Sequence, residues 1–425
     1  MPDSAAGRWR RLANNELIRH GALVFISTML VNVLSFAFHV LVSRRLGVAT
    51  YGSLNALLAG LAILAVPSLI LTTIVVKYAA EFRALGDLMR LRALTLRVAV
   101  GLSAIALVVA LACAIATPLI SAFLHVSDTA AIALAISILA LNFVLPALRG
   151  ILQGVEDFRA FAISAVIEAA VKVALAIGLT ALGWGLAGAL EAWLIGSVVA
   201  FAYTGAVLWL RYRGVGACSL HLDYARLART SANVAVALFC VTSLSFVDVI
   251  IVKHAFDAQT AGLYGATALA GKMLFYLVSF VPAVLLPRAV TLAMGGKPVL
   301  PVLLQALAMV GFLAGCGLFL FASIPTLIVT VLAGGAFAGA APLLFSYGVA
   351  ATLLAALNTA VLFKLGIHRF DFVAPLAAIA ILELVALAFF HDTPQRVIGT
   401  LIAANACALV TTLYRVWTPP AAARG

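Results

Sequence analysis

Charged side chains stand inside long apolar stretches of this chain, where they could bind an anion or hold a coupling ion. They are Glu168, Lys172, Glu191, Asp248, Lys272 and Glu383, with His39 as a neutral companion. A charged side chain at the centre of a bilayer costs at least roughly 2.5–3.5 kcal/mol, so we expect these groups to face protein or a hydrated cavity. The lysines predict recognition of an anionic group, and the carboxylates predict ion pairs or a proton or sodium site.

Two pairs of these charges each have two open interpretations. Lys172 follows Glu168 by four residues, which places both on one helix face. They form either a self-neutralising structural pair or a cavity-facing pair in which an incoming anion competes for Lys172. Asp248 and Lys272 lie at similar depths on consecutive predicted spans. They form either an interhelical ion pair, or a site at Asp248 whose titration is coupled to movement.

Further charges lie nearer the predicted outer face. Glu191 is placed to reach headgroups, while Arg44 and Arg45 either guard the outer mouth of a cavity or bind lipid phosphates. The candidates for binding a substrate are Lys172, Lys272, Arg44, Arg45 and His39. The candidates for coupling or structural ion pairs are Glu168, Asp248, Glu191 and Glu383. The five cysteines are scattered without metal-ligand spacing, so no metal site is predicted.

The composition predicts a membrane protein. Hydrophobic residues make up 65% of the 425 residues, and charged residues only 10%, whereas about a quarter of a soluble protein is charged. Apolar stretches of about 20 residues recur along the chain, which is the length that crosses a bilayer. We place twelve transmembrane helices at about 21–42, 53–76, 95–117, 130–149, 160–181, 185–209, 231–252, 265–291, 301–331, 341–363, 372–390 and 397–417.

The basic residues predict the orientation of these helices. With both termini in the cytoplasm, only Arg44, Arg45, Lys253 and Arg396 of the 27 Lys and Arg fall in outer loops, as the positive-inside rule requires. Arg149 and Lys364 count among the inner loop residues in this assignment. The segment 77–94 is expected to form a basic amphipathic helix at the membrane surface. The net charge of +12 belongs to short loops, so no nucleic-acid partner is expected.

An internal repeat divides the chain into two halves. Leu34-Ser35-Phe36 returns as Leu244-Ser245-Phe246, Ala59-Gly60 as Ala270-Gly271, and Gly154-x₃-Phe158 as Gly366-x₃-Phe370. We therefore predict an all-α polytopic fold with six-helix lobes at 1–213 and 214–425. Six is even, so the lobes are expected to be related by a pseudo-twofold axis along the membrane normal, with substrate between them. Pro67 and Pro282 occupy similar places and predict kinks. At the same offset, Lys172 corresponds in depth to Glu383.

Several ordered motifs carry a family resemblance. They are Arg45-Leu-Gly47-Val-Ala-Thr-Tyr51-Gly52, Lys77-Tyr-Ala-Ala-Glu81-Phe-Arg, Gly154-Val-Glu-Asp-Phe158-Arg, and the block from Asp248 to Tyr264 that ends in Pro287-Arg288. Together they resemble the bacterial polysaccharide flippases, the O-antigen and exopolysaccharide branch of the multidrug/oligosaccharidyl-lipid/polysaccharide exporter superfamily. The likeness extends over nearly the whole chain.

The resemblance implies a function in the bacterial inner membrane. A member would flip a polyprenyl-pyrophosphate-linked oligosaccharide to the periplasmic leaflet by alternating access, for O-antigen or exopolysaccharide synthesis. Its partners would be that lipid, membrane lipids, and the polymerase and glycosyltransferases of the pathway. No cofactor is expected beyond coupling to H⁺ or Na⁺.

Two other functions are open. One is an ion-coupled multidrug or metabolite antiporter of the same superfamily, which the lysines disfavour because they attract anions rather than cationic drugs. The other is a membrane polymerase or ligase, which the short outer loops disfavour. No catalytic Ser-His-Asp grouping or phosphate-binding glycine loop falls in a water-accessible segment, so an enzyme is not expected.

Overall fold

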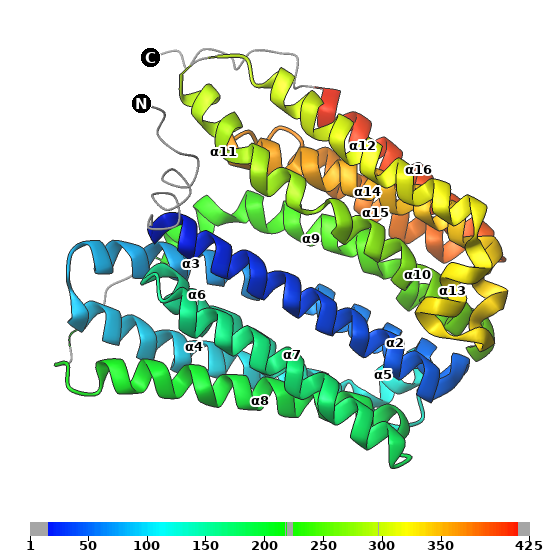
Figure 1. Cartoon of the computed structure of the whole chain (residues 1–425), viewed down its shortest axis with the longest axis horizontal. Helices are drawn as coiled ribbons and strands as arrows, with labels where there is room; N and C mark the ends of the chain where they lie inside the picture. The colour runs from blue at the N-terminus through cyan, green and yellow to red at the C-terminus, as the bar shows by residue number, and fades with distance from the viewer. Residues whose placement is uncertain (1–15, 217, 219–223, 296, 415–425) are drawn as a thin grey trace, which may run out of the picture. The chain divides into compact units, whose positions relative to one another are not determined.

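A computed structural model describes residues 16–414 except 217, 219–223 and 296, and helices dominate that part of the chain (Figure 1). Ten helices are long and apolar enough to cross a membrane, from Ala22–Leu64 to Pro394–Tyr414, and Val373–Phe389 is a shorter apolar helix. The predicted all-α polytopic fold is therefore confirmed. The chain is a multi-pass membrane protein.

The helices follow the predicted spans closely. The first half contains α2 (Glu16–Leu64), α3 (Val66–Ala84), α4 (Leu88–Ile115), α5 (Thr117–Leu124), α6 (Thr129–Gly154), α7 (Phe158–Ala181) and α8 (Gly185–Tyr212). The second half contains α9 (Tyr224–Ala255), α10 (Ala258–Val278), α11 (Phe280–Met294), α12 (Leu300–Ser323), α13 (Pro325–Ala333), the 3₁₀ helix η1 (Gly335–Ala340), α14 (Ala341–Gly366), α15 (Val373–Phe389) and α16 (Pro394–Tyr414).

Helix α2 contains one predicted span and the start of the next. Its 49 residues would extend about 74 Å at 1.5 Å per residue, more than twice the roughly 30 Å apolar thickness of a bilayer. Gly47 interrupts it with φ 73° and ψ 173°, a conformation that a residue without Cβ adopts readily. The second span continues into α3 after a break at Ala65.

Both predicted proline kinks are present. Pro67 follows the break between α2 and α3, and Pro282 follows the break at Ser279 between α10 and α11. Proline lacks the N–H that would bond four residues back, which weakens the helix at these places.

Two sequence expectations about the inner loops were wrong. The segment 77–94 is not a separate surface helix, because residues up to Ala84 continue α3 and α4 begins at Leu88. Gly86, with φ 66°, and Asp87, whose side chain accepts from the Arg90 N–H at 2.9 Å, make a tight turn there instead. In addition, Lys364 lies at the end of α14, buried and paired with Asp371 at 3.1 Å, rather than exposed in a loop.

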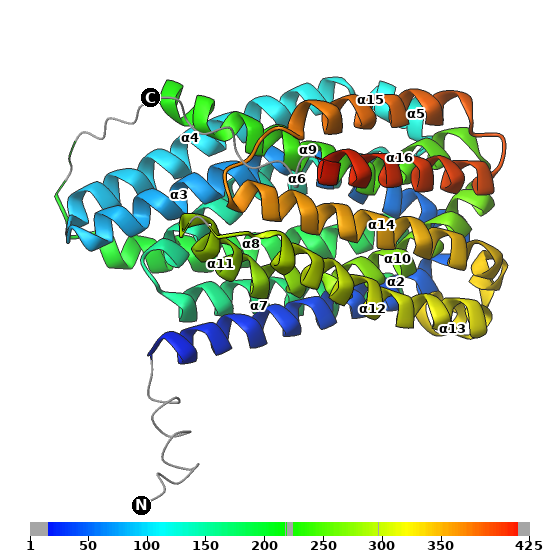
Figure 2. The ribbon, with the colours of Figure 1, turned by 90° about the horizontal axis from the view of Figure 1, so that it is seen from above.

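The described chain forms two compact units. Unit 1 comprises residues up to Arg45, Pro67–Ile120 and Asp128–Tyr224, and unit 2 comprises Leu46–Val66, Ser121–Ser127 and the chain from Ala225. In unit 1, α7 packs along α8, and α6 packs against α4 and α8. In unit 2, α14 is central, with α10, α12 and α16 against it (Figure 2). The division into lobes at 213 and 214 stays a prediction.

Within unit 2, the end of α2 packs very closely against α10. A Cβ atom on Gly262 would lie 2.0 Å from the carbonyl oxygen of Val48, and one on Gly52 would lie 2.9 Å from the Gly262 nitrogen. Beside this contact, Tyr51 packs edge-on to Phe337 with ring centroids 5.7 Å apart. Glycine on both helices is therefore required for this approach.

The repeat is visible in local backbone geometry. Helix α6 ends at Gly154 and α14 at Gly366, and two residues later Glu156 and His368 have φ of 58° and 56°. Non-glycine residues rarely adopt positive φ. The same unusual conformation at matching positions supports the internal duplication.

Candidate functional site

In unit 1, Lys172 extends from α7 between two aromatic rings. Its Nζ lies 4.3 Å from the ring centroid of Trp193 on α8 and 5.2 Å from that of Phe38 on α2. It also donates a long hydrogen bond of 3.4 Å to the Ser35 hydroxyl. Only 6% of Lys172 is exposed. Ring faces attract a cation through their quadrupoles but carry no net charge, so the ammonium is held without being neutralised by them.

Glu168 does not pair with Lys172, although the sequence places them one turn apart. Its Oε2 lies 2.7 Å from an Nη atom of Arg149, and its Oε1 accepts from the Ser197 hydroxyl at 2.9 Å. Arg149 also donates to the hydroxyl and the carbonyl of Ser164, both at 2.8 Å. No direct ion pair within 4 Å joins Glu168 and Lys172 among the described residues, although the two charges interact electrostatically; the carboxylate itself is paired with Arg149 and Ser197.

Arg149 was missed because it was counted as an inner loop residue. It lies on α6 with a side chain only 14% exposed. Two glycines that follow Arg149 in the sequence indicate that it is buried. A Cβ atom on Gly150 would lie 3.1 Å from Thr72, and one on Gly154 would lie 2.6 Å from Ala79. Small residues four apart mark a close helix contact, which places the neighbouring arginine inside the protein.

In unit 2, Asp248 is held by two tyrosines. Its Oδ2 accepts from the hydroxyls of Tyr264 on α10 and Tyr347 on α14, both at 2.8 Å. Asp248 is 1% exposed, and its Oδ1 has no hydrogen-bond partner among the described residues. Lys272 interacts electrostatically with Asp248, but its Nζ lies over the Phe246 ring at 3.8 Å. No direct ion pair within 4 Å joins Asp248 and Lys272 in the described chain, so the first of the two open interpretations, a direct interhelical ion pair, is not what the structure has.

Glu383 brings a second carboxyl group into this cluster. It extends from α15, is 2% exposed, and neither oxygen has a hydrogen-bond partner among the described residues. It interacts electrostatically with Asp248. Like charges in apolar surroundings repel each other, so a bound proton or cation would stabilise this pair.

Two positions that correspond in the internal repeat lie close together within each unit, but the side chains at these positions differ in chemistry between the units. At the offset that relates Ser35 to Ser245, Phe38 corresponds to Asp248, while Lys172 corresponds to Glu383 at nearly the same offset. Unit 1 therefore places a lysine against an aromatic ring, and unit 2 places one carboxyl group near another. The duplicated backbone positions two different sites.

The remaining candidates lie around these clusters or apart from them. His39 packs edge-on to Phe38 with ring centroids 5.5 Å apart. Arg44 and Arg45 are exposed just before the Gly47 kink. Glu191 is half-buried on α8. Among the described residues, no group of three or more His, Cys, Asp or Glu side chains could hold a metal ion.

The different partners of Arg149 and Lys172 predict different effects on stability. Arg149→Met leaves the part-buried Glu168 without its cation, so we expect a loss of about 3 kcal/mol and a marked fall in Tm. Glu168→Met in the same protein should recover much of this loss. Lys172→Met leaves no carboxylate unpaired and should change Tm little. Thermal unfolding of the purified variants measures this, and equal losses for Arg149→Met and Lys172→Met would contradict the assignment.

Comparison with solved structures shows the same fold in known transporters. An inward-facing multidrug resistance MATE family transporter of the MOP superfamily superposes with a TM-score of 0.72, at 13% identity, over 90% of this chain and 92% of its own. The lipid II flippase MurJ in an inward closed conformation gives 0.68, at 15% identity, over 92% and 87%. A MATE structure in complex with MaD3S gives 0.60, at 15% identity, over 93% and 94%.

At these identities the structural likeness establishes the fold alone. No curated protein matches the sequence. The polysaccharide biosynthesis protein family, however, matches residues 17–292, well over half of the chain. This agrees with the resemblance carried by the Arg45–Gly52 and Asp248–Tyr264 motifs. The chain belongs to the polysaccharide biosynthesis protein family and has the fold of the MOP-superfamily transporters.

Proposed function

We propose that this protein flips a polyprenyl-pyrophosphate-linked oligosaccharide from the cytoplasmic to the periplasmic leaflet of a bacterial inner membrane. Transport would proceed by alternating access and would serve the synthesis of a surface polysaccharide such as O-antigen or exopolysaccharide. The observation that carries this proposal is Lys172, a cation buried in a membrane helix and held by aromatic rings instead of a carboxylate.

The strengths of the interactions favour capture of a phosphate. A cation–π contact contributes roughly 0.5–2 kcal/mol, whereas a hydrogen bond to a charged group contributes roughly 1.5–3 kcal/mol. Because the rings of Phe38 and Trp193 together contribute about as much as one such hydrogen bond, a pyrophosphate oxygen could bind the Lys172 ammonium at little net cost. Had Glu168 been its partner, the incoming anion would first have to displace a carboxylate.

The same arrangement disfavours the other two functions. A cationic drug would be repelled by Lys172, whereas an anionic headgroup is attracted. The fold shared with known transporters favours transport over a polymerase or ligase. The fold is shared with a protein described as a lipid II flippase, which supports a lipid-linked cargo.

We place ion coupling in unit 2, at Asp248 and Glu383. The hydroxyls of Tyr264 and Tyr347 occupy one oxygen of Asp248 and leave Oδ1 and both Glu383 oxygens open. Three open carboxyl oxygens could share a proton or bind a sodium ion.

Loss of Lys172 should stop export. In a strain lacking the native gene, Lys172→Ala should leave lipid-linked repeat units exposed on the inner leaflet and surface polymer reduced at least tenfold, with normal protein levels. Lys172→Arg should retain part of the activity because a cation remains. Lys77→Ala, which removes an exposed lysine, is the matched control. Normal surface polymer with Lys172→Ala, or in the deletion strain itself, would contradict the proposal.

Exchanging the charges of Asp248 and Lys272 distinguishes coupling from structural pairing. The double variant Asp248→Lys with Lys272→Asp preserves a pair of opposite charges but removes the carboxyl group between Tyr264 and Tyr347. We expect folded protein whose export no longer responds to the proton or sodium gradient. The measurement is uptake into vesicles with and without an imposed gradient. Full gradient-driven activity of the exchanged protein would contradict a coupling role for Asp248.

A further inference from the structure

Two segments from the first half of the chain, Leu46–Val66 and Ser121–Ser127, belong to unit 2 together with the second half. Each carries part of a predicted outer loop, and each contacts outer loops that are predicted in the second half. In the orientation that the basic residues predict, these contacts lie at the outer face of the membrane. They therefore join the two halves of the chain on the side where the cargo would leave.

The first contact is between two glycines that correspond in the internal repeat. Gly52 and Gly262 differ by the same offset as the two Leu-Ser-Phe motifs. A Cβ atom on Gly52 would lie 2.9 Å from the Gly262 nitrogen, and one on Gly262 would overlap the Val48 carbonyl oxygen. The backbones of α2 and α10 therefore touch only because neither position has a side chain.

The other contacts are between aromatic rings. Tyr51, which precedes the first glycine, packs edge-on to Phe337 of η1, and both rings are fully buried. Phe123 at the end of α5 stacks on His254 at the end of α9, with ring centroids 4.1 Å apart. The His254 Nδ1 also donates to the Phe123 carbonyl oxygen at 2.8 Å. Both residues of this second pair are exposed, and a stack with one hydrogen bond can separate without unfolding a helix.

Breaks in the backbone lie at both ends of the segment Leu46–Val66. Gly47, with φ 73° and ψ 173°, interrupts α2 where the chain enters unit 2, and the break at Ala65 lies where the chain leaves it. Helices bend where their hydrogen bonds are interrupted. The segment between the two breaks can therefore move as a rod.

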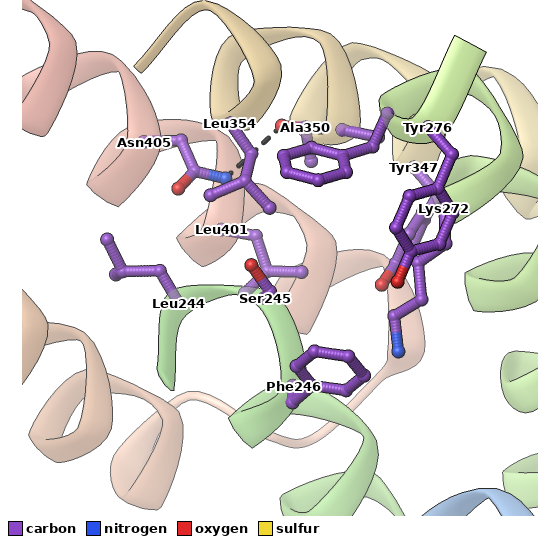
Figure 3. A pocket seen from close by; sticks show the side chains of 12 residues that line it. Leu244, Ser245, Phe246, Lys272, Tyr276, Tyr347, Ala350, Leu354, Leu401 and Asn405 are labelled. Atoms are coloured by element: carbon purple, nitrogen blue, oxygen red, sulfur yellow. Dashed lines mark hydrogen bonds between the residues drawn. The ribbon is translucent and has the colours of Figure 1, made fainter. Parts of the chain in front are cut away.

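Helix α10 connects the glycine contact to the cluster around Asp248. Tyr264, two residues after Gly262, donates to the Asp248 carboxylate at 2.8 Å. Further along the same helix, Lys272 lines a small cavity beside this cluster together with Tyr347 (Figure 3). An ion that binds at the cluster can therefore act on the glycine contact through a single helix.

We propose that these contacts form the outer gate of the transporter and that this gate is closed in the structure. It opens when the segment Leu46–Val66 bends at Gly47 and Ala65 and moves away from α10. The inference rests on the proposed alternating access, and it names the part of the chain that performs this step on the outer side. A side chain at Gly52 or Gly262 would keep the loops apart and hold the gate open.

The test places a reporter inside the closed gate. Ala56 is fully buried and lies one turn after Gly52 on the same helix face, so Ala56→Cys should react with a membrane-impermeant maleimide only when the gate opens. In right-side-out vesicles, Gly52→Val or Gly262→Val should raise its labelling rate about tenfold. The same variants in liposomes should move the lipid about tenfold more slowly. A Cβ atom on Gly60 meets nothing within 4 Å, so Gly60→Val is the matched control and should change neither rate.

The outcomes separate this inference from the proposed function. Labelling that does not increase with Gly52→Val and Gly262→Val would overturn the inference, whether or not translocation slows. Failure of the wild-type protein to move the lipid would contradict the proposed function, while the labelling, which needs no lipid, would still decide on the gate. Tm values identify a variant that misfolds. In that case Gly262→Ala, which adds a single methyl group, should give smaller changes in the same direction, and no change would overturn the inference.

Discussion

The site in unit 1 depends on the ion pair between Arg149 and Glu168. Without Arg149, the Glu168 carboxylate would pair with Lys172, which lies four residues further along the same helix. Because Arg149 binds Glu168 at 2.7 Å and is itself fixed by Ser164, Lys172 is left to Ser35 and two aromatic rings. Ionisable side chains inside a membrane span almost always pair with another group, and they commonly mark a substrate pathway. Evolution of such an arrangement is easiest to understand if an anion completes it during transport.

Unit 2 has carboxyl groups at the positions of the duplicated backbone where unit 1 has an aromatic ring and a lysine. Where unit 1 has Phe38 and Lys172, unit 2 has Asp248 and Glu383, and two tyrosine hydroxyls replace the aromatic faces as the supporting groups. Tyrosines can satisfy one carboxyl oxygen while leaving the others open, which a neighbouring lysine within ion-pair distance would not permit. Lys272 lies instead over Phe246, a second case of a lysine held by a ring. The two units therefore share a helical scaffold but differ in which charge they leave available.

Hydropathy and basic-residue counting were sufficient to predict the helical fold, because apolar length is imposed by the bilayer itself. The same counting wrongly assigned Arg149 to an inner loop, because it lies only five residues from the end of α6. Periodicity suggested a Glu168–Lys172 pair, but spacing within one helix cannot show that a neighbouring helix, α6, supplies the direct partner Arg149. The sequence indicated Tyr264 only as the end of the family motif that begins at Asp248, and it did not indicate Tyr347 at all, because long-range hydrogen bonds leave no local signal. The repeat offset relates position 38 to position 248. Only the structure shows that each of these positions lies beside the repeat counterpart of the other buried charge, Lys172 or Glu383.

The central claim is that Lys172 meets the anionic headgroup of the cargo directly. Equilibrium binding of a short-chain prenyl pyrophosphate sugar to the purified protein tests it most directly, with Lys172→Met compared with wild type and with Lys77→Met. We expect Lys172→Met to weaken binding at least tenfold, or about 1.4 kcal/mol, at unchanged Tm, while Lys77→Met has no effect. Equal affinity of the wild type and the Lys172→Met protein would contradict it.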